Sequence, residues 1–323
     1  MNADAAPMAA DGYVWGRRSS RVGPSAFQMR FSAFIGVASA FIGVSTAFGI
    51  TVSTAAEISL VDDAGRKVEL KAPAQRIVTM APFLTELAFS AGAGDRVVGV
   101  SAHSDYPPQA RALPEVGTAM AFSIEPIAAM RPDLALVWKD SVRPEDLKRL
   151  EALGVAVFVA QARTLDDVPR LLAAIGRLAG RDASAAIEGY RATLARLRAR
   201  HEGLPRIRAF LEIWHKPLTT LAGAHWINEA LELCGARNAF LDLPGIAPQV
   251  SWEEVLARDP QVIVGAGSAK NAAEFRGNWR ARVSLAAVRQ ERLVFVDADT
   301  IQRPTLRLAE GVAQLCAGLE KVR

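Results

Sequence analysis

Two segments of the chain, 123–137 and 251–265, match each other at one constant offset. Each begins with a Ser-x-Glu triplet, continues through an apolar stretch to a proline, and ends in a hydrophobic run. The matched pairs are Ser123 with Ser251, Glu125 with Glu253, Ile127 with Val255, and Pro132 with Pro260. A helical pattern that breaks at a proline and resumes as a hydrophobic run is typical of a helix followed by a buried strand. The duplication therefore predicts two lobes of similar design.

The remainder of the chain alternates short hydrophobic strands with amphipathic helices after a hairpin over 58–70. The expected strands cover 76–80, 97–100, 134–138, 155–159, 207–213, 218–221, 262–265 and 293–296. One expected helix begins at Pro82, and the others cover 124–130, 144–153, 165–179, 182–201 and 305–321. Alternation at this spacing predicts parallel, doubly wound sheets.

The helix over 182–201 divides the alternation into two halves. Its apolar residues recur close to every fourth position, and the chain then turns at Gly-Leu-Pro before strands resume. A continuous helix is a stiff connector, unlike a Gly/Ser linker. We therefore predict an α/β protein of two Rossmann-like lobes joined by one long α-helix. The expected parts are an N-terminal extension with a signal peptide (1–56), an N-terminal lobe (57–181), an interdomain helix (182–204) and a C-terminal lobe (205–323).

The N-terminal segment has the pattern of an export signal. Arg30 precedes a long run of apolar and small residues, and a small-residue stretch leads to Ala55 and Ala56. A basic flank, an apolar core and a small-residue exit predict a secretory signal peptide cleaved near Ala56. The alternative is a membrane anchor, because the run is nearly long enough to span a bilayer. Either Met1 or Met29 could be the true start.

Composition excludes two classes of protein. Of the 323 residues, 50% are hydrophobic and 22% are charged, which is far from the composition of a disordered chain. The formal net charge is only +4, and no basic stretch with interleaved aromatic residues occurs. A nucleic-acid-binding groove is therefore not expected.

The chain contains two cysteines, Cys234 and Cys316, each in a helical pattern. In an exported protein they are candidates for a disulfide, which for a loop of this length contributes about 4–5 kcal/mol in the chain-entropy model. The alternative is two unrelated buried thiols. Two cysteines and four scattered histidines do not form a structural zinc pattern, so we expect no metal site.

The two Ser-x-Glu triplets place Glu125 and Glu253 in the first turn of a helix. Ser251 and Glu254 have the spacing of a capping box. A first-turn carboxylate is stabilised by the helix dipole by about 0.3–1 kcal/mol, which is one explanation for both glutamates. It does not explain why each lobe has the same carboxylate at the equivalent corner. Two like charges on two similar lobes fit a partner with two matching basic patches.

No catalytic pattern was found in the sequence, which lacks a G-x-S-x-G elbow, an H-E-x-x-H helix and a Walker loop. The segment GAGSAK (265–270) lacks phosphate-loop spacing and is interpreted as a turn after a strand. A cleft between two lobes, lined by aromatic and polar residues that follow strands, favours ligand capture. The candidate ligand-binding residues are Tyr106, Trp138, Trp214, Asp299 and Arg303. Each could instead pack at a rim. His215 is a further polar candidate, whereas Trp226 and Trp252 are expected on helices.

Several stretches together resemble the periplasmic cobalamin-binding proteins, the substrate-binding components of vitamin B12 ABC importers. They are TELAFSAGAG, VGVSAHSDYPPQA, IEPIAAMRPDLALVW, LELCGARNAF, PQVSWEEVLARDPQVIV and the final AQLC. The resemblance implies the helical-backbone periplasmic binding protein fold, with Tyr106 and Trp138 against the corrin and Asp299 and Arg303 near its polar edge. It further implies that Glu125 and Glu253 dock on arginines of the permease dimer and that Cys234 and Cys316 form the family's disulfide.

The sequence departs from that family at two positions where the best-known members have tryptophan. Ala119 replaces one tryptophan and Ala247 the other, and Trp214 is expected to supply part of the lost stacking area. We thus expect a periplasmic, monomeric binding protein without cofactor or catalytic activity, whose transported ligand is cobalamin or a related corrinoid. The alternatives are a ferric-siderophore or haem binder with Tyr106 as an iron ligand, and an exported hydrolase, for which no nucleophile–base pair is evident.

Overall fold

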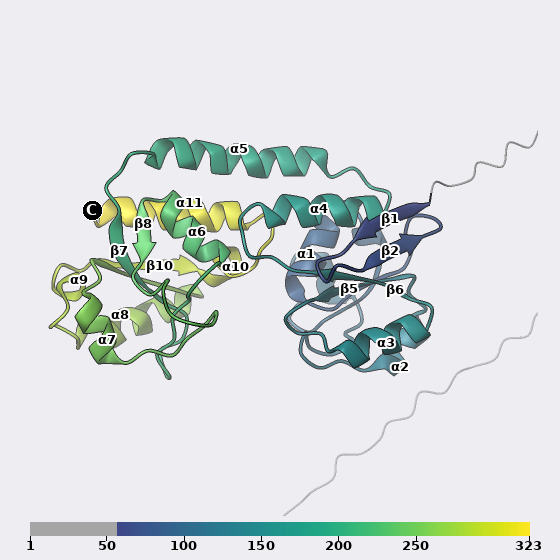
Figure 1. Cartoon of the computed structure of the whole chain (residues 1–323), viewed down its shortest axis with the longest axis horizontal. Coiled ribbons are helices and arrows are strands. Elements are labelled where there is room, and N and C mark those ends of the chain that lie inside the picture. The colour runs from purple at the N-terminus through teal and green to yellow at the C-terminus, as the bar shows by residue number, and fades with distance from the viewer. Residues whose placement is uncertain (1–56) are drawn as a thin grey trace, which may run out of the picture. The chain divides into compact units, whose positions relative to one another are not determined.

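The computed structural model describes residues 57–323. The predicted export signal, its cleavage site near Ala56 and the alternative start at Met29 lie outside the described residues. We call residues 57–181 the N-lobe and residues 205–323 the C-lobe. Each lobe contains one four-stranded parallel sheet, and Figure 1 shows the two sheets beneath a single long helix.

The N-lobe begins with an antiparallel hairpin, β1 (Ile58–Val61) and β2 (Lys67–Leu70). Its sheet has the strand order β4-β3-β5-β6. The strands are β3 (Ile77–Thr79), β4 (Val97–Val100), β5 (Leu134–Trp138) and β6 (Ala156–Ala160). The helices are α1 (Pro82–Ser90), α2 (Ile124–Met130), α3 (Pro144–Ala152) and α4 (Asp167–Leu178). All of these were expected from the sequence, with ends that differ by a few residues.

The C-lobe sheet has the order β10-β9-β7-β8. The strands are β7 (Ile207–Glu212), β8 (Ala236–Asn238), β9 (Val262–Gly267) and β10 (Leu293–Asp297). The helices are α6 (Trp226–Leu233), α7 (Trp252–Arg258), α8 (Ala272–Arg280), α9 (Ala286–Arg289), α10 (Ala298–Ile301) and α11 (Leu308–Lys321). Written from the other edge, this order is β8-β7-β9-β10, which repeats the N-lobe order β4-β3-β5-β6 strand for strand.

The prediction of a strand at 218–221 was wrong. Its backbone pairs with neighbouring loops instead of the sheet: Thr219 bridges to Trp214 and Gln249, and the Thr220 amide donates to the Pro248 carbonyl. The segment is held by these loop bridges and lies outside the sheet. The edge position of the sheet is taken by β8, which was not expected.

The connecting helix α5 (Ser184–His201) lies alongside both α4 and α11, one from each lobe (Figure 1). Tyr190 and Leu194 are buried, and Ala186 and Leu197 pack partly against the same core, as the periodicity predicted. The Tyr190 hydroxyl donates to the Leu165 carbonyl at 3.0 Å. One buried apolar cluster continues through α1, α4, α5, α6 and α11, so the lobes share a core along the helix side.

Candidate functional site

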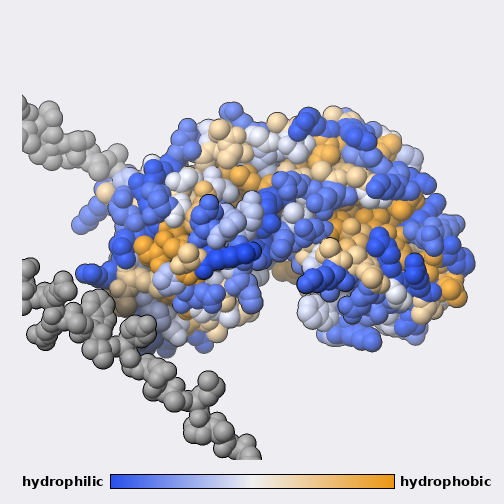
Figure 2. All heavy atoms as spheres, turned by 180° about the vertical axis from the view of Figure 1, so that it is seen from behind, coloured by the Kyte–Doolittle hydropathy of each residue, from blue (hydrophilic) through white to orange (hydrophobic). Residues whose placement is uncertain are grey.

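The two lobes face each other across residues that follow the carboxyl ends of strands. In the N-lobe, Trp138 ends β5 and packs edge-on against Phe83, with ring centroids 6.1 Å apart. In the C-lobe, Trp226 begins α6 and its indole N–H donates to the Ile301 carbonyl at 3.0 Å. Figure 2 shows a hollow between the two lobes. Because ligands of open α/β sheets bind at this edge, the hollow is the first candidate site.

A cavity of about 160 Å³ lies at this seam. Both lobes line it, the N-lobe with Ala81, Pro82, Phe83, Ala119, Trp138 and Ala162, and the C-lobe with Trp226, Gln302, Arg303 and Pro304. The structure thus brings together Trp138 and Arg303, two of the predicted residues. Ala119, where the resemblance led us to expect a tryptophan, lies on the wall of this same cavity. The lining is mainly apolar, which suits the face of a large ring system.

Glu86 of α1 is the centre of an ion-pair network between the lobes. Its side chain is 2% exposed, and it accepts hydrogen bonds from Arg303 at 3.0 Å and from Arg307 at 2.6 Å. Arg303 also pairs with Asp105 at 2.8 Å and with Asp299 at 3.3 Å. Three of these four carboxylate–guanidinium contacts join the two lobes, and the fourth joins Asp299 to Arg303 within the C-lobe. This network was not predicted from the sequence.

The charges in the network support one another. Burial would raise the pKa of the Asp105 carboxyl, but the hydrogen bond and charge of Arg303 outweigh burial and hold that pKa below its ordinary value. Burial opposes the charge of Arg303 and Arg307, and their carboxylate partners more than compensate, so both guanidinium pKa values are raised. Asp105, Arg303 and Arg307 are therefore charged at neutral pH.

Tyr106 lies on the N-lobe side of the seam, in the loop after β4, and is 41% exposed. The guanidinium carbon of Arg307 lies 3.9 Å from the centre of its ring, a cation–π contact from the opposite lobe. Tyr106 borders a shallow surface pocket with Phe89 and Gln109 and does not line the 160 Å³ cavity.

The remaining predicted ligand residues lie elsewhere at the same edge. Trp214 is 64% exposed and lines a separate cavity within the C-lobe, together with His215. Asp299 lies in α10 and is linked to the seam through its ion pair with Arg303. Trp226, expected on a helix to pack or to stay near the surface, is buried and also lines the inter-lobe cavity. The available signal was a weaker sequence match, which pairs Thr85, Glu86 and Gly92 of the N-lobe with Asn228, Glu229 and Gly235 and so relates the start of α6 to that of α1.

Glu125 and Glu253 occupy the same position in two equivalent helices. Each is the second residue of a seven-residue helix, α2 or α7, and each is exposed. Both helices end at a left-handed residue before the matched proline, Arg131 in α2 and Asp259 in α7. The two carboxylates are thus held alike on short, rigid helices of the two lobes.

Cys234 and Cys316 are both buried, at the end of α6 and within α11. Their sulfurs lie at bonding distance, their Cα atoms are 4.8 Å apart, and 82 positions separate them in the sequence. This is the geometry of a disulfide. Among residues 57–323, no three His, Cys, Asp or Glu side chains lie where they could hold a metal ion together. The same residues contain no helix with the length and apolarity needed to cross a bilayer.

Two α/β lobes of the same topology, stiffly joined and facing each other through strand ends, define a two-lobed ligand-binding protein. The family model for periplasmic binding proteins matches residues 77–300. The chain therefore belongs to the periplasmic binding protein family.

Curated relatives and solved structures agree with this membership. The vitamin B12-binding protein of Vibrio cholerae serotype O1 is 37% identical over 251 residues, which cover 77% of this chain and 90% of the relative. That of Pectobacterium carotovorum is 34% identical over 250 residues, 76% of this chain and 88% of the relative. The crystal structure of the periplasmic vitamin B12 binding protein of Vibrio cholerae matches with a TM-score of 0.72 over 77% of this chain and 98% of that one. A periplasmic haem-binding protein from Pseudomonas aeruginosa, 27% identical, matches with a TM-score of 0.65, covering 76% of this chain and 92% of that one.

Proposed function

We propose that this protein captures cobalamin or a closely related corrinoid between its lobes and delivers it to the permease dimer of an ABC importer. The observation that carries the proposal is the 37% identity to a vitamin B12-binding protein over 77% of the chain. It is supported by the placement of Trp138 and Arg303 on facing walls of one inter-lobe cavity. The protein performs no chemistry on its cargo.

We assign the corrin face to aromatic residues at the seam. Trp138, supported by Phe83, and Tyr106 form the N-lobe wall, and Trp214 extends the surface from the C-lobe. Asp299 and Arg303 are assigned to the polar edge of the ligand. Aromatic rings offer large, rigid contact areas to a flat macrocycle at a low cost in side-chain entropy.

Ligand entry requires the seam to rearrange. The cavity of about 160 Å³ is smaller than the roughly 300–1,000 Å³ typical of small-molecule sites, and a corrinoid is a large ligand. Arg303 is engaged by Glu86 and Asp105, and Arg307 covers the ring of Tyr106. Binding therefore exchanges some of these inter-lobe contacts for ligand contacts, while the shared core beneath α5 limits how far the lobes move.

Delivery is assigned to Glu125 and Glu253. Two equivalent exposed carboxylates on rigid helices suit a two-fold partner with matching arginines, because each carboxylate can receive a bidentate charge-assisted hydrogen bond. The protein acts as a monomer in the periplasm after cleavage of its signal peptide near Ala56. In that oxidising compartment Cys234 and Cys316 form the disulfide that their geometry permits.

A ferric-siderophore or haem ligand is the second candidate function, because haem-binding proteins share this fold. Mixing the purified exported protein with cyanocobalamin, haemin or a ferric siderophore and separating free ligand by gel filtration distinguishes them. We expect only the absorption spectrum of cyanocobalamin to elute with the protein, at one ligand per chain. Co-elution of haemin or siderophore without cyanocobalamin would overturn the assignment. Turnover that is lost on mutating a cleft residue would instead indicate the hydrolase alternative.

A further inference from the structure

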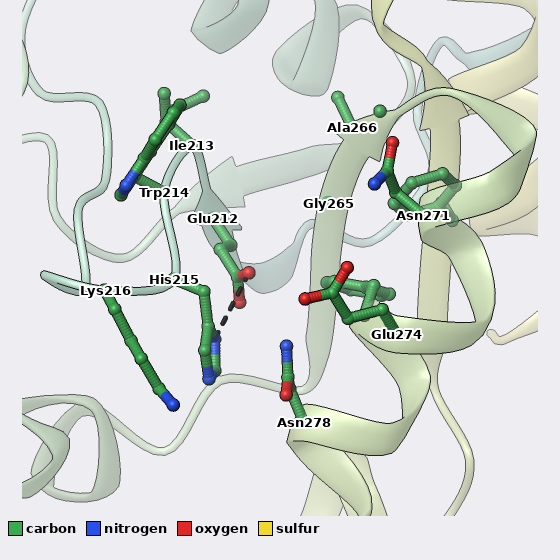
Figure 3. Close-up of a pocket in the computed structure, with 13 residues that line it drawn as sticks. Glu212, Ile213, Trp214, His215, Lys216, Gly265, Ala266, Asn271, Glu274 and Asn278 are labelled. Carbon is green, nitrogen blue, oxygen red and sulfur yellow. Dashed lines mark ion pairs between the residues drawn. The ribbon is translucent and has the colours of Figure 1, made fainter. Parts of the chain in front are cut away.

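The C-lobe contains a cavity of about 530 Å³ that none of the assigned roles explains. It opens between the ends of β7 and β9, which is where the strand order of the sheet reverses (Figure 3). The segment GAGSAK was interpreted from the sequence as a turn after a strand, but its first three residues, Gly265, Ala266 and Gly267, end strand β9 and line the cavity. The lining residues are Glu212, Ile213, Trp214, His215, Lys216, Gly265, Ala266, Gly267, Asn271, Glu274, Phe275, Asn278 and Phe295. Reversal points of this kind are the usual ligand-binding crevices of doubly wound sheets.

The end of β9, which borders the cavity, is built from small residues. By the offset of the sequence repeat, Ala266 is the counterpart of Trp138 in the N-lobe. A side chain at Gly265 would clash with the ring of Phe275, and one at Gly267 would meet Phe295. The position that an indole fills in one lobe is therefore left open in the other.

A buried acid–imidazole pair lies at the base of the cavity. Glu212 ends β7, is 8% exposed and accepts a hydrogen bond from the Trp279 indole N–H at 2.5 Å. Its second oxygen lies 3.4 Å from Nδ1 of His215, and that nitrogen is buried without a hydrogen-bond partner among the described residues. Burial raises the pKa of the Glu212 carboxyl, against the opposing effects of His215 and Trp279. The Glu212 carboxyl and the His215 imidazole are therefore held beside each other at the base of the cavity.

The opposite wall is polar as well. Glu274 and Asn278, both from α8, point toward Glu212 and His215 in Figure 3. The two carboxylates accept hydrogen bonds, and the Asn278 amide and the imidazole can each donate or accept. Trp214 and Phe295 add aromatic surface. A ligand group that both donates N–H bonds and accepts one, while carrying no negative charge, matches this set.

We propose that this cavity holds a neutral primary-amide arm of the bound macrocycle and rejects a carboxylate arm at the same place. The amide N–H groups donate to Glu212 and Glu274, and its carbonyl accepts from Asn278. A carboxylate arm has no N–H group, so it could donate no hydrogen bond to the oxygens of Glu212 or Glu274. Corrinoids carry primary amides on their periphery, whereas haem carries propionates, so the cavity selects between the two ligand classes. The inference rests on the proposed function and extends it to the specificity of one subsite.

The test compares cyanocobalamin with its separated monocarboxylic acids, in which mild acid hydrolysis has converted one peripheral amide to a carboxylate. Affinities are measured for the wild type, Glu274→Gln, Glu212→Gln/Glu274→Gln, and the control Glu188→Gln, an exposed glutamate of α5 outside every cavity described above. The Glu212→Gln change keeps a carbonyl acceptor for the Trp279 indole, and Glu274 is exposed, so at least the single variant Glu274→Gln remains folded.

For at least one isomer, we expect the wild type to prefer the amide form by about 10-fold or more, the ratio that 1.4 kcal/mol gives. The double variant should reduce that preference to about threefold or less by gaining affinity for the acid, and Glu274→Gln should fall between, because each change introduces an amide N–H group that can donate to a carboxylate arm. Glu188→Gln should match the wild type. A preference that persists in both Gln variants, or that no isomer shows, would overturn the subsite while leaving cobalamin binding in place. Failure of the wild type to bind cyanocobalamin at all would overturn the proposed function itself.

Discussion

The two lobes have the same strand order but differ at the point where that order reverses. In the N-lobe, Trp138 ends β5 and fills this point with an indole that faces the other lobe. In the C-lobe, the matched position is Ala266, and the space opens into a polar cavity around Glu212. Duplication thus preserved the scaffold, and the side chains at the reversal point gave the two lobes different surfaces for a ligand. An asymmetric cargo with a flat face and a polar fringe fits such a pair.

The features that the lobes share make the strongest prediction. Replacing Glu125 and Glu253 together by arginine should reduce cobalamin uptake and association with the permease by more than about 100-fold, because each site changes from attraction to repulsion. Affinity for cyanocobalamin should not change, since both residues are exposed on short helices. Uptake of labelled cyanocobalamin in cells and copurification with the importer are the measurements. The control is the double reversal of Glu188 and Glu202, two exposed glutamates at α5. Normal uptake by the Glu125/Glu253 variant would show that the matched carboxylates do not dock.

A second contrast is the covalent link that only the C-lobe has. In the weaker sequence match, Thr85, Glu86 and Gly92 pair with Asn228, Glu229 and Gly235, and at the same offset Cys234 corresponds to Ala91 of the N-lobe. The variant Cys234→Ser/Cys316→Ser should lose about 2–5 kcal/mol of unfolding free energy, the usual cost of removing a native disulfide. Urea unfolding of the wild type with and without reductant measures the same quantity, and reductant should not affect the double variant. Equal stability of oxidised and reduced wild type would contradict the link.

The two glutamates that the weaker sequence match pairs, Glu86 and Glu229, have different hydrogen-bond partners and should contribute unequally to stability. Glu86 accepts from two arginines of the other lobe, whereas Glu229 accepts from the Leu165 backbone amide at 2.7 Å. Glu86→Ala should cost about 3 kcal/mol, because it leaves two partly buried guanidinium groups without their main partner. Glu229→Ala should cost about 1 kcal/mol, the value of one hydrogen bond. Denaturant unfolding of Glu86→Ala and Glu229→Ala measures the two losses of unfolding free energy. Equal losses would show that the ion-pair network does not hold the lobes together.

The smallest effect concerns Ser123 and Ser251, the N-cap residues of α2 and α7. The Ser251 hydroxyl accepts from the Glu254 amide at 3.1 Å, and the Glu254 carboxylate accepts from the Ser251 amide at 2.7 Å. Ser123 makes no side-chain capping hydrogen bond to α2. Ser251→Ala should therefore cost about 1 kcal/mol and Ser123→Ala much less. Thermal unfolding of both variants measures the difference, and a larger loss at Ser123 would reverse the comparison.

Much of the fold could be predicted because local patterns and the repeat agreed. Helix α2 was predicted from its Ser-x-Glu segment, strand β5 from the hydrophobic run that ends at Trp138, and helix α5 from its periodicity. The error at 218–221 arose because this segment pairs with loop residues, Thr219 with Trp214 and Gln249, instead of joining the sheet. Strand β8 was missed because its three residues, Ala236–Asn238, are too few to show a period.

The site was harder to predict because its decisive contacts join distant residues. Nothing local to Glu86 shows that Arg303 and Arg307 reach it from the other lobe, more than 200 positions later. Sequence reasoning found Arg303 but not the carboxylate that holds it. The C-lobe cavity did leave a signal, since the repeat aligns Trp138 with Ala266, and a loss of that volume at a strand end indicates an open space.

The central claim is that both lobes together hold one corrinoid. Isothermal titration of the exported protein with cyanocobalamin tests it most directly, with cobinamide as a second ligand to show how far the lower nucleotide contributes. The account predicts one saturable site per chain with a Kd of about 1 µM or tighter, which corresponds to about −8 kcal/mol, and a large loss of affinity in Trp138→Ala. The absence of saturable heat with either corrinoid, in a protein that binds haemin or a ferric siderophore, would contradict it.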